Sequence, residues 1–325
     1  MESNHVMLKE RLKFSGILKE ALSIPLRNTN FIIFTLLTSL PLFCFMVLYE
    51  ILFQRTLVQA SEILDPAYDG YFDYNWPVPT YIEGRFSKKF VVNLIQMCFL
   101  YLVPLHLLEL FNAILTVDLA SKMHKGVTKV TIREMVHKST KATRFRGPSI
   151  TSMYVLFLST CTLLGLTWLV INYYFISRNI FYGCFFVAAF IALLTKYLEW
   201  SAVWNMSIVI SVVEGLYGTE ALALSDHFSR RSRRDGLLFM LVFFVWGFGL
   251  RLPCLYVGCY KEVGGGVVAQ VGLFCVGNVM KWVVCMVYFF DCRNGTFINE
   301  GVETEVEDAD AEAPLIVPVS LDRMV

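Results

Sequence analysis

Residues 208–245 read IVISVVEGLYGTEALALSDHFSRRSRRDGLLFMLVFFV. An apolar stretch ends at the acidic residue Glu214, a short amphipathic stretch follows, and a basic cluster precedes the next apolar stretch. A basic segment next to an apolar run is typical of the cytosolic end of a transmembrane helix. The pattern therefore predicts two membrane spans joined by a charged cytosolic junction.

The composition of the whole chain agrees with this prediction. Hydrophobic residues make up 56% of the 325 residues and charged residues 17%, whereas soluble domains carry roughly 25% charged residues. The mean hydropathy is +0.57. The net charge of +1 conceals an uneven distribution along the chain, so it indicates nothing about binding partners. We expect a membrane protein with several spans.

Six apolar stretches are long enough to cross a hydrocarbon core, which requires about 20 helical residues. Unpaired backbone groups are unfavourable in lipid, so the spans should be helices and the fold an all-α membrane bundle. We expect a basic amphipathic cytosolic segment at 1–30, a membrane domain at 31–291 and a disordered acidic cytosolic tail at 292–325. The predicted spans are residues 31–53, 90–117, 150–176, 181–210, 237–257 and 267–290.

The lysines and arginines outside the spans set the expected topology. The N-terminal segment, the second and fourth connections and the C-terminal tail together contain 19, and the other three connections contain six. By the positive-inside rule, both termini are cytosolic, in an endomembrane or the plasma membrane. The sequon at Asn294 should then carry no glycan.

Short amphipathic helices are expected before spans one, three and five, within residues 1–30, 131–146 and 214–234. Spans two, four and six each approach the cytosol with an acidic residue. This suggests three repeated units, each consisting of a surface helix and two spans. Convergence is the alternative, because any membrane hairpin needs basic cytosolic flanks. The candidate junction residues are Asp118, Glu214, Glu220, Ser225 and Asp291.

Charged residues inside the predicted spans form a second group of candidates. His106 and Glu109 lie three residues apart, as do Lys196 and Glu199, so each pair shares a helix face. Such residues are unfavourable in lipid and normally contact partners or water. They indicate either a transport path or a salt-bridge network that fixes helix assembly. The candidate network comprises His106, Glu109, Lys196, Glu199, Arg251 and Lys281.

No catalytic motif is present. The chain lacks a G-x-S-x-G elbow, an H-E-x-x-H motif and zinc-spaced cysteines and histidines. We expect no catalytic residues, no cofactor and no metal, although an unrecognised catalytic site stays open. The basic stretches flank spans, so their counter-charge should be anionic lipid and not nucleic acid. The candidate lipid contacts are Arg230, Arg231, Arg233 and Arg234.

The C-terminal tail has a different character. Residues 300–312 contain seven acidic residues and no basic residue, a composition typical of disorder. Protein partners that bind this acidic tail are one interpretation, and a solvated tail without such a role is the other.

Short motifs of this chain occur at 208–214 (IVISVVE), Gly218, 220–222 (EAL) and Ser225, together with 15–21 (SGILKEA). Through these motifs and the six-span layout, most of the chain resembles a plant family of uncharacterised multi-span membrane proteins. The chain is more distantly similar to the membrane domain associated with bacterial glycerophosphodiester phosphodiesterases. The soluble phosphodiesterase domain is absent, so the resemblance implies a membrane architecture and carries over no catalytic residue.

Two functions remain after these observations. The first is a non-catalytic membrane protein in membrane organisation, trafficking or regulation, acting through its cytosolic interfacial helices. The alternative is a transporter or channel for a small solute, ion or lipid that uses the intramembrane charges. Charges paired across dry helix contacts favour the first, and charges along a wet cavity favour the second.

Overall fold

The chain folds into a bundle of α-helices. The computed structural model describes residues 14–64, 88–125, 143–176, 180–257 and 265–311. All regular secondary structure in these residues is helical. Six helical segments are long and apolar enough to cross a membrane. The expected all-α fold with six membrane spans is confirmed.

Each predicted span lies within one of these helical segments, and several of the helices continue beyond the predicted ends. A helix satisfies its own backbone hydrogen bonds, so it can continue past the hydrocarbon core. The spans are α2 (Thr29–Leu64), the composite of α4 (Lys88–Leu100), η2 (Tyr101–Leu105) and α5 (His106–His124), α7 (Thr143–Ile176), α8 (Ile180–Val213), α10 (Arg233–Val257) and α11 (Gly265–Ala311).

The second span is interrupted near its middle. Segment η2 is a π-helical turn that contains Pro104. Proline lacks the N–H that an α-helix needs at this position, so the hydrogen-bond ladder is displaced locally. The interruption separates α4 from α5, which carries the candidate residues of this span.

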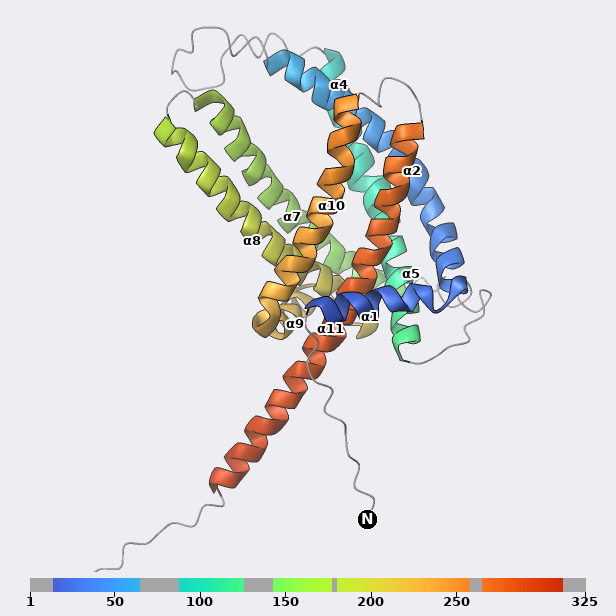
Figure 1. Ribbon diagram of the computed structural model, residues 1–325, viewed down its shortest axis with the longest axis vertical. Coiled ribbons are helices and arrows are strands. Elements are labelled where there is room, and N and C mark those ends of the chain that lie inside the picture. Colours follow the sequence, from blue (N-terminus) through green and yellow to red (C-terminus); the bar gives the residue numbers. More distant parts are fainter. Residues whose placement is uncertain (1–13, 65–87, 126–142, 177–179, 258–264, 312–325) are drawn as a thin grey trace, which may run out of the picture.

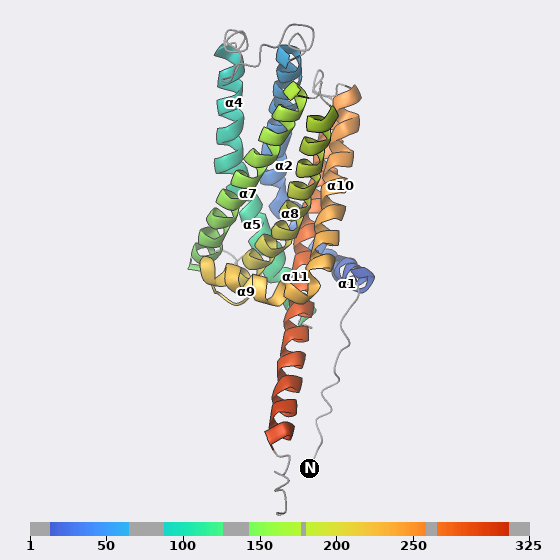
Figure 2. The same ribbon diagram turned by 90° about the vertical axis from the view of Figure 1, so that its left-hand side faces the viewer.

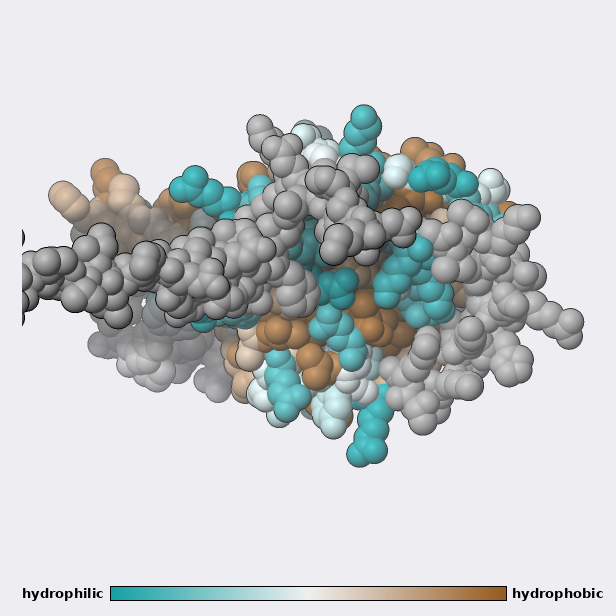
Figure 3. Space-filling model, turned by 90° about the horizontal axis from the view of Figure 1, so that it is seen from below, coloured by the Kyte–Doolittle hydropathy of each residue, from teal (hydrophilic) through white to brown (hydrophobic). Residues whose placement is uncertain are grey.

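Two short helices lie crosswise to the spans at one end of the bundle (Figures 1 and 2). Helix α1 (Phe14–Leu26) and helix α9 (Thr219–Ser229) lie at the level where α11 leaves the bundle. We call this end the junction end. Seen from below in Figure 3, it carries hydrophilic side chains with apolar surface between them.

The crosswise helices precede the first and the third pair of spans, as the three-unit hypothesis expects. Most of the corresponding segment before the second pair, 131–142, lies outside the described residues. The three-unit hypothesis therefore stays a prediction.

Helix α11 is the central element of the core. It packs against α1, α2, α5, α8 and α10, and its residues from Trp282 to Phe290 are all buried. The most apolar 18-residue stretch of this span is 61% buried, more than that of any other described span. Around it, α7 and α8 form a hairpin that leans away from the other spans at the end opposite α9 (Figure 1).

A disordered tail was expected from residue 292 onward, but the first part of this segment is helical in the structure. Helix α11 continues without a break to Ala311. Nucleation is the unfavourable step of helix formation, so a helix already fixed in the membrane can propagate into the residues that follow, even past Gly295 and Gly301. Residues 312–325 lie outside the described part of the chain.

Candidate functional site

The junction between α8 and α9 is a tight loop that depends on glycine. Gly215 and Gly218 have φ values of 76° and 67°, and no other described residue has a positive φ. Side chains of L-residues rarely tolerate this conformation, so the two glycines set the path of the loop. The Gly218 N–H donates a hydrogen bond to Thr151 Oγ1 on α7 at 3.0 Å. The loop is therefore held against α7.

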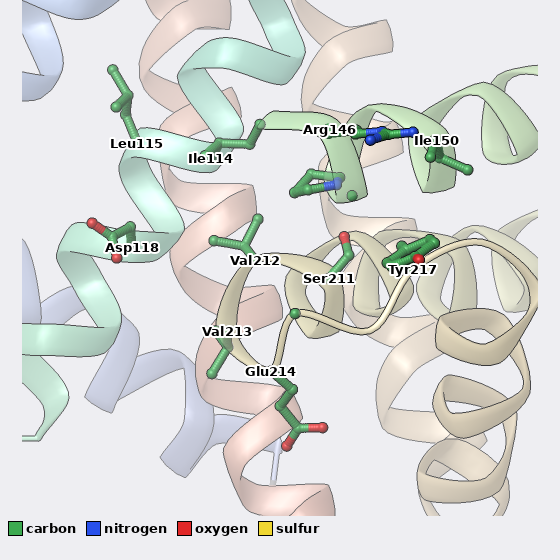
Figure 4. A pocket seen from close by; sticks show the side chains of 13 residues that line it. Ile114, Leu115, Asp118, Arg146, Ile150, Ser211, Val212, Val213, Glu214 and Tyr217 are labelled. Carbon is green, nitrogen blue, oxygen red and sulfur yellow. The ribbon is translucent and has the colours of Figure 1, made fainter. Parts of the chain in front are cut away.

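This loop closes one side of a cavity of about 560 Å³ at the junction end. The cavity lies between α5, the start of α7 and the end of α8 (Figure 4). Leu115 and Asp118 approach it from α5, and Arg146 and Tyr217 lie on the side formed by α7 and the loop. Ile114, Ile150 and Val212 add apolar walls. Polar and apolar groups thus share one cavity.

Both acidic residues at this cavity have a cation of their own. Asp118 forms an ion pair with Lys122 one helical turn away. Glu214 accepts a hydrogen bond from Arg293 Nη1 on α11 at 3.3 Å, and Figure 4 shows its carboxylate pointing away from Arg146. Sequence analysis singled out both acids as junction residues, and the structure brings them to one cavity.

The other junction residues have different positions. Ser225 is fully buried and donates a hydrogen bond to the Val203 carbonyl oxygen of α8 at 2.6 Å. Glu220 is exposed in the first turn of α9, and Asp291 lies on α11. None of these three lines the cavity. Ser225 instead fixes α9 against α8.

Helix α9 has the amphipathic faces that its sequence predicts. Ala221, Ser225 and Phe228 are buried on one face, and Phe228 packs against Phe289 of α11 with ring centroids 6.1 Å apart. The expected apolar face is confirmed, but it contacts other helices of the same chain. The predicted position of α9 at the cytosolic membrane surface stays a prediction. The arginines expected on the opposite face lie beyond the last residue of this helix, Ser229.

The four arginines that follow this helix are all exposed. They occupy a 3-10 turn, η3 (Arg230–Ser232), and the start of α10. Asp226 pairs with Arg230 at 3.3 Å and with Arg233 at 2.8 Å. Arg231 and Arg234 form no ion pair within the described residues. These two arginines therefore carry the unneutralised charge of the cluster.

The most buried intramembrane charge was missed by sequence analysis. Glu50 of α2 is 2% exposed, and its carboxylate accepts hydrogen bonds from Arg251 Nη2 at 3.3 Å, Gln270 Nε2 at 2.9 Å and Gln54 Nε2 at 3.1 Å. Arg251 is thus paired with Glu50 across the bundle. Glu50 lies inside the predicted first span, so its charge was the available signal.

The remaining intramembrane candidates form separate contacts. Lys281 of α11 pairs with Glu109 of α5 at 3.2 Å. His106 Nε2 lies 2.9 Å from Ser152 Oγ of α7, in a hydrogen bond.

Lys196 pairs with Glu199 on the same helix at 2.7 Å, as their spacing predicts. None of the six network candidates lines the cavity at the junction end. The ion pairs Glu50–Arg251 and Glu109–Lys281 therefore join different helices, whereas Lys196–Glu199 lies within α8.

Comparisons with protein-family models, with curated proteins and with solved structures found no match for this chain. The six apolar helices make it a membrane protein, and any finer role has to be argued from the contacts described above.

Proposed function

We propose that this chain is a non-catalytic membrane protein of an endomembrane or the plasma membrane, with both termini in the cytosol. It acts in membrane organisation, trafficking or regulation by binding anionic lipid at its junction end. The plant family of multi-span proteins named above is the proposed set of relatives.

One observation carries this proposal: unneutralised arginines lie at the end where α1 and α9 cross the bundle, whereas the charges within the spans have partners. Arg231 and Arg234 are exposed there. The anionic cytosolic leaflet attracts each nearby lysine or arginine by about 1 kcal/mol. The basic end of the bundle is therefore suited to the leaflet that the positive-inside rule assigns to it.

The rival function, transport or conduction, requires polar groups along a continuous path. In the described residues, Glu50, Glu109, His106 and Lys196 belong to four separate contacts. This distribution favours a structural role for the charges. Reconstituted flux that is lost in a Glu109→Gln/Lys196→Gln/Lys281→Gln variant would support the rival instead.

Boundary-lipid selectivity of the full-length protein tests the proposal. Spin-labelled phosphatidylserine and phosphatidylcholine are compared in nanodiscs by electron paramagnetic resonance. We expect phosphatidylserine to be preferred, with a preference that decreases at high salt. Arg231→Gln/Arg234→Gln should move the selectivity ratio toward one.

Arg55→Gln/Lys88→Gln is the matched control. It removes two exposed charges from α2 and α4 at the opposite end of the bundle, so it should leave the ratio unchanged when the spin-labelled lipid is confined to the leaflet next to α1 and α9. Equal effects of the two double variants, or no preference in the unmodified protein, would contradict the proposal.

A further inference from the structure

The cavity at the junction end has a free positive charge. Its acids, Asp118 and Glu214, are paired with Lys122 and Arg293. Arg146 is exposed at the cavity and forms no hydrogen bond or ion pair with any residue that the structure describes. The net charge that a ligand meets there is therefore that of one guanidinium group.

A hydrogen-bond donor accompanies this charge. The side chain of Tyr217 lines the cavity and packs over Gly147, where an added Cβ would lie 3.5 Å from Tyr217 Cβ. Its hydroxyl group has no hydrogen-bond partner among the described residues. Guanidinium and hydroxyl groups together form the donor set that phosphate oxygens prefer.

The apolar walls indicate what else the ligand carries. Ile114 and Ile150 line the cavity, and helical spacing places Phe111 of α5 and Tyr154 and Phe157 of α7 on the same helix faces. These three side chains are large and exposed, and they lead from the cavity toward the middle of the spans. A ligand with a phosphate and long apolar chains would contact both regions.

We propose that this cavity binds the phosphate group of a phospholipid from the cytosolic leaflet, with Arg146 as its counter-charge. The acyl chains lie along the exposed apolar faces of α5 and α7. The volume is within the range of about 300–1,000 Å³ that is usual for small-ligand sites. This site deepens the proposed function and rests on the orientation proposed there. It differs from the arginines after α9 because it holds a single lipid in a defined cavity.

Native mass spectrometry of the delipidated full-length protein tests this site. The protein is titrated with phosphatidic acid, with phosphatidylserine and with diacylglycerol of the same acyl chains. One phospholipid per chain should bind with the highest affinity, and diacylglycerol should bind at least about tenfold more weakly, because it lacks the phosphate. Arg146→Gln should weaken phospholipid binding by about tenfold, and Arg146→Lys should restore most of it.

Two further variants separate the cavity from the general positive charge. Ile150→Trp fills the cavity and keeps Arg146, so it should remove the tightly bound lipid. Arg231→Gln removes an exposed charge elsewhere at the same end and should leave this lipid in place. Thermal unfolding of each variant verifies that it is folded, and the Arg146 variants decide the question if Ile150→Trp does not fold.

Three results would overturn the assignment. Equal weakening by Arg146→Gln and Arg231→Gln would show a diffuse field and no cavity site, while the proposed function would stand. Binding of diacylglycerol as tight as that of phosphatidic acid would exclude phosphate recognition. If millimolar inorganic phosphate stabilised the protein through Arg146 and phospholipid did not, the ligand would be a soluble phosphate. Conversely, a single lipid retained through Arg146 without boundary selectivity would support the cavity and contradict the proposed function.

Discussion

Glu50 offers the sharpest test of whether the charges in the spans are structural. Its carboxylate is 2% exposed and lies 3.3 Å from Arg251, with Gln54 and Gln270 as further donors. The variant Glu50→Gln keeps the shape of the side chain, removes its charge and leaves Arg251 without a counter-charge. We expect it to lower the free energy of unfolding.

The expected magnitude follows from the surroundings of Arg251. Removing one partner of a buried ion pair costs about 3–5 kcal/mol. Arg251 is 33% exposed and lies over the rings of Phe53 and Phe274, at 5.3 and 5.4 Å from their centroids. Each ring contact retains about 0.5–2 kcal/mol for the cation. The loss should therefore be about 3 kcal/mol, the lower end of the range.

The assay is reversible unfolding of the purified protein in mixed micelles, followed by circular dichroism. Asp226→Asn is the control, because its arginine partners are exposed and such pairs contribute at most about 1 kcal/mol. Glu50→Gln/Arg251→Met should recover part of the stability, since neither charge remains. If Glu50→Gln were no more destabilising than Asp226→Asn, the reasoning on paired charges would be refuted.

Three other predictions concern packing, the junction and topology. Gly277→Ala should be about 1–3 kcal/mol less stable than Gly249→Ala. An added Cβ at Gly277 would lie 2.7 Å from Trp246 Nε1 of α10, whereas no atom lies within 4 Å of one added at Gly249. Equal unfolding midpoints of the two variants would contradict this packing. Ser225→Ala should lower stability by about 1 kcal/mol and reduce folded yield more than Ser229→Ala, whose hydroxyl bonds only its own helix; normal yield with a selective loss of lipid binding would argue for a direct role. The Asn294 sequon should stay unmodified in microsomes, and a glycan detected there by a mobility shift would reverse the orientation.

The fold could be predicted well from local sequence because membrane spans are encoded locally. A run of about 20 apolar residues suffices for a span, and all six were located. The apolar face of α9 followed from helical spacing in the same way. What this face contacts could not be predicted: Phe228 packs on Phe289, more than 50 residues later. Such contacts depend on how distant helices assemble.

The candidate site was predictable only in part. Asp118 and Glu214 were identified because each acid ends a span, but their meeting at one cavity depends on the loop with two positive-φ glycines. Arg146 was counted only as one of many basic residues in its connection. The lack of a partner for its guanidinium group follows from the structure alone, because sequence spacing does not reveal which acids the other cations neutralise.

Asymmetric proteoliposomes provide the most direct test that the junction end is a cytosolic, anionic-lipid-binding face. Phosphatidylserine is confined to one leaflet, the orientation of the protein is fixed by selection for an accessible C-terminal tag, and boundary-lipid selectivity is measured for each leaflet. We predict a salt-sensitive preference for phosphatidylserine only in the leaflet next to α1 and α9, which Arg231→Gln/Arg234→Gln reduces. An equal preference in both leaflets, or a preference only in the opposite leaflet, would contradict this account.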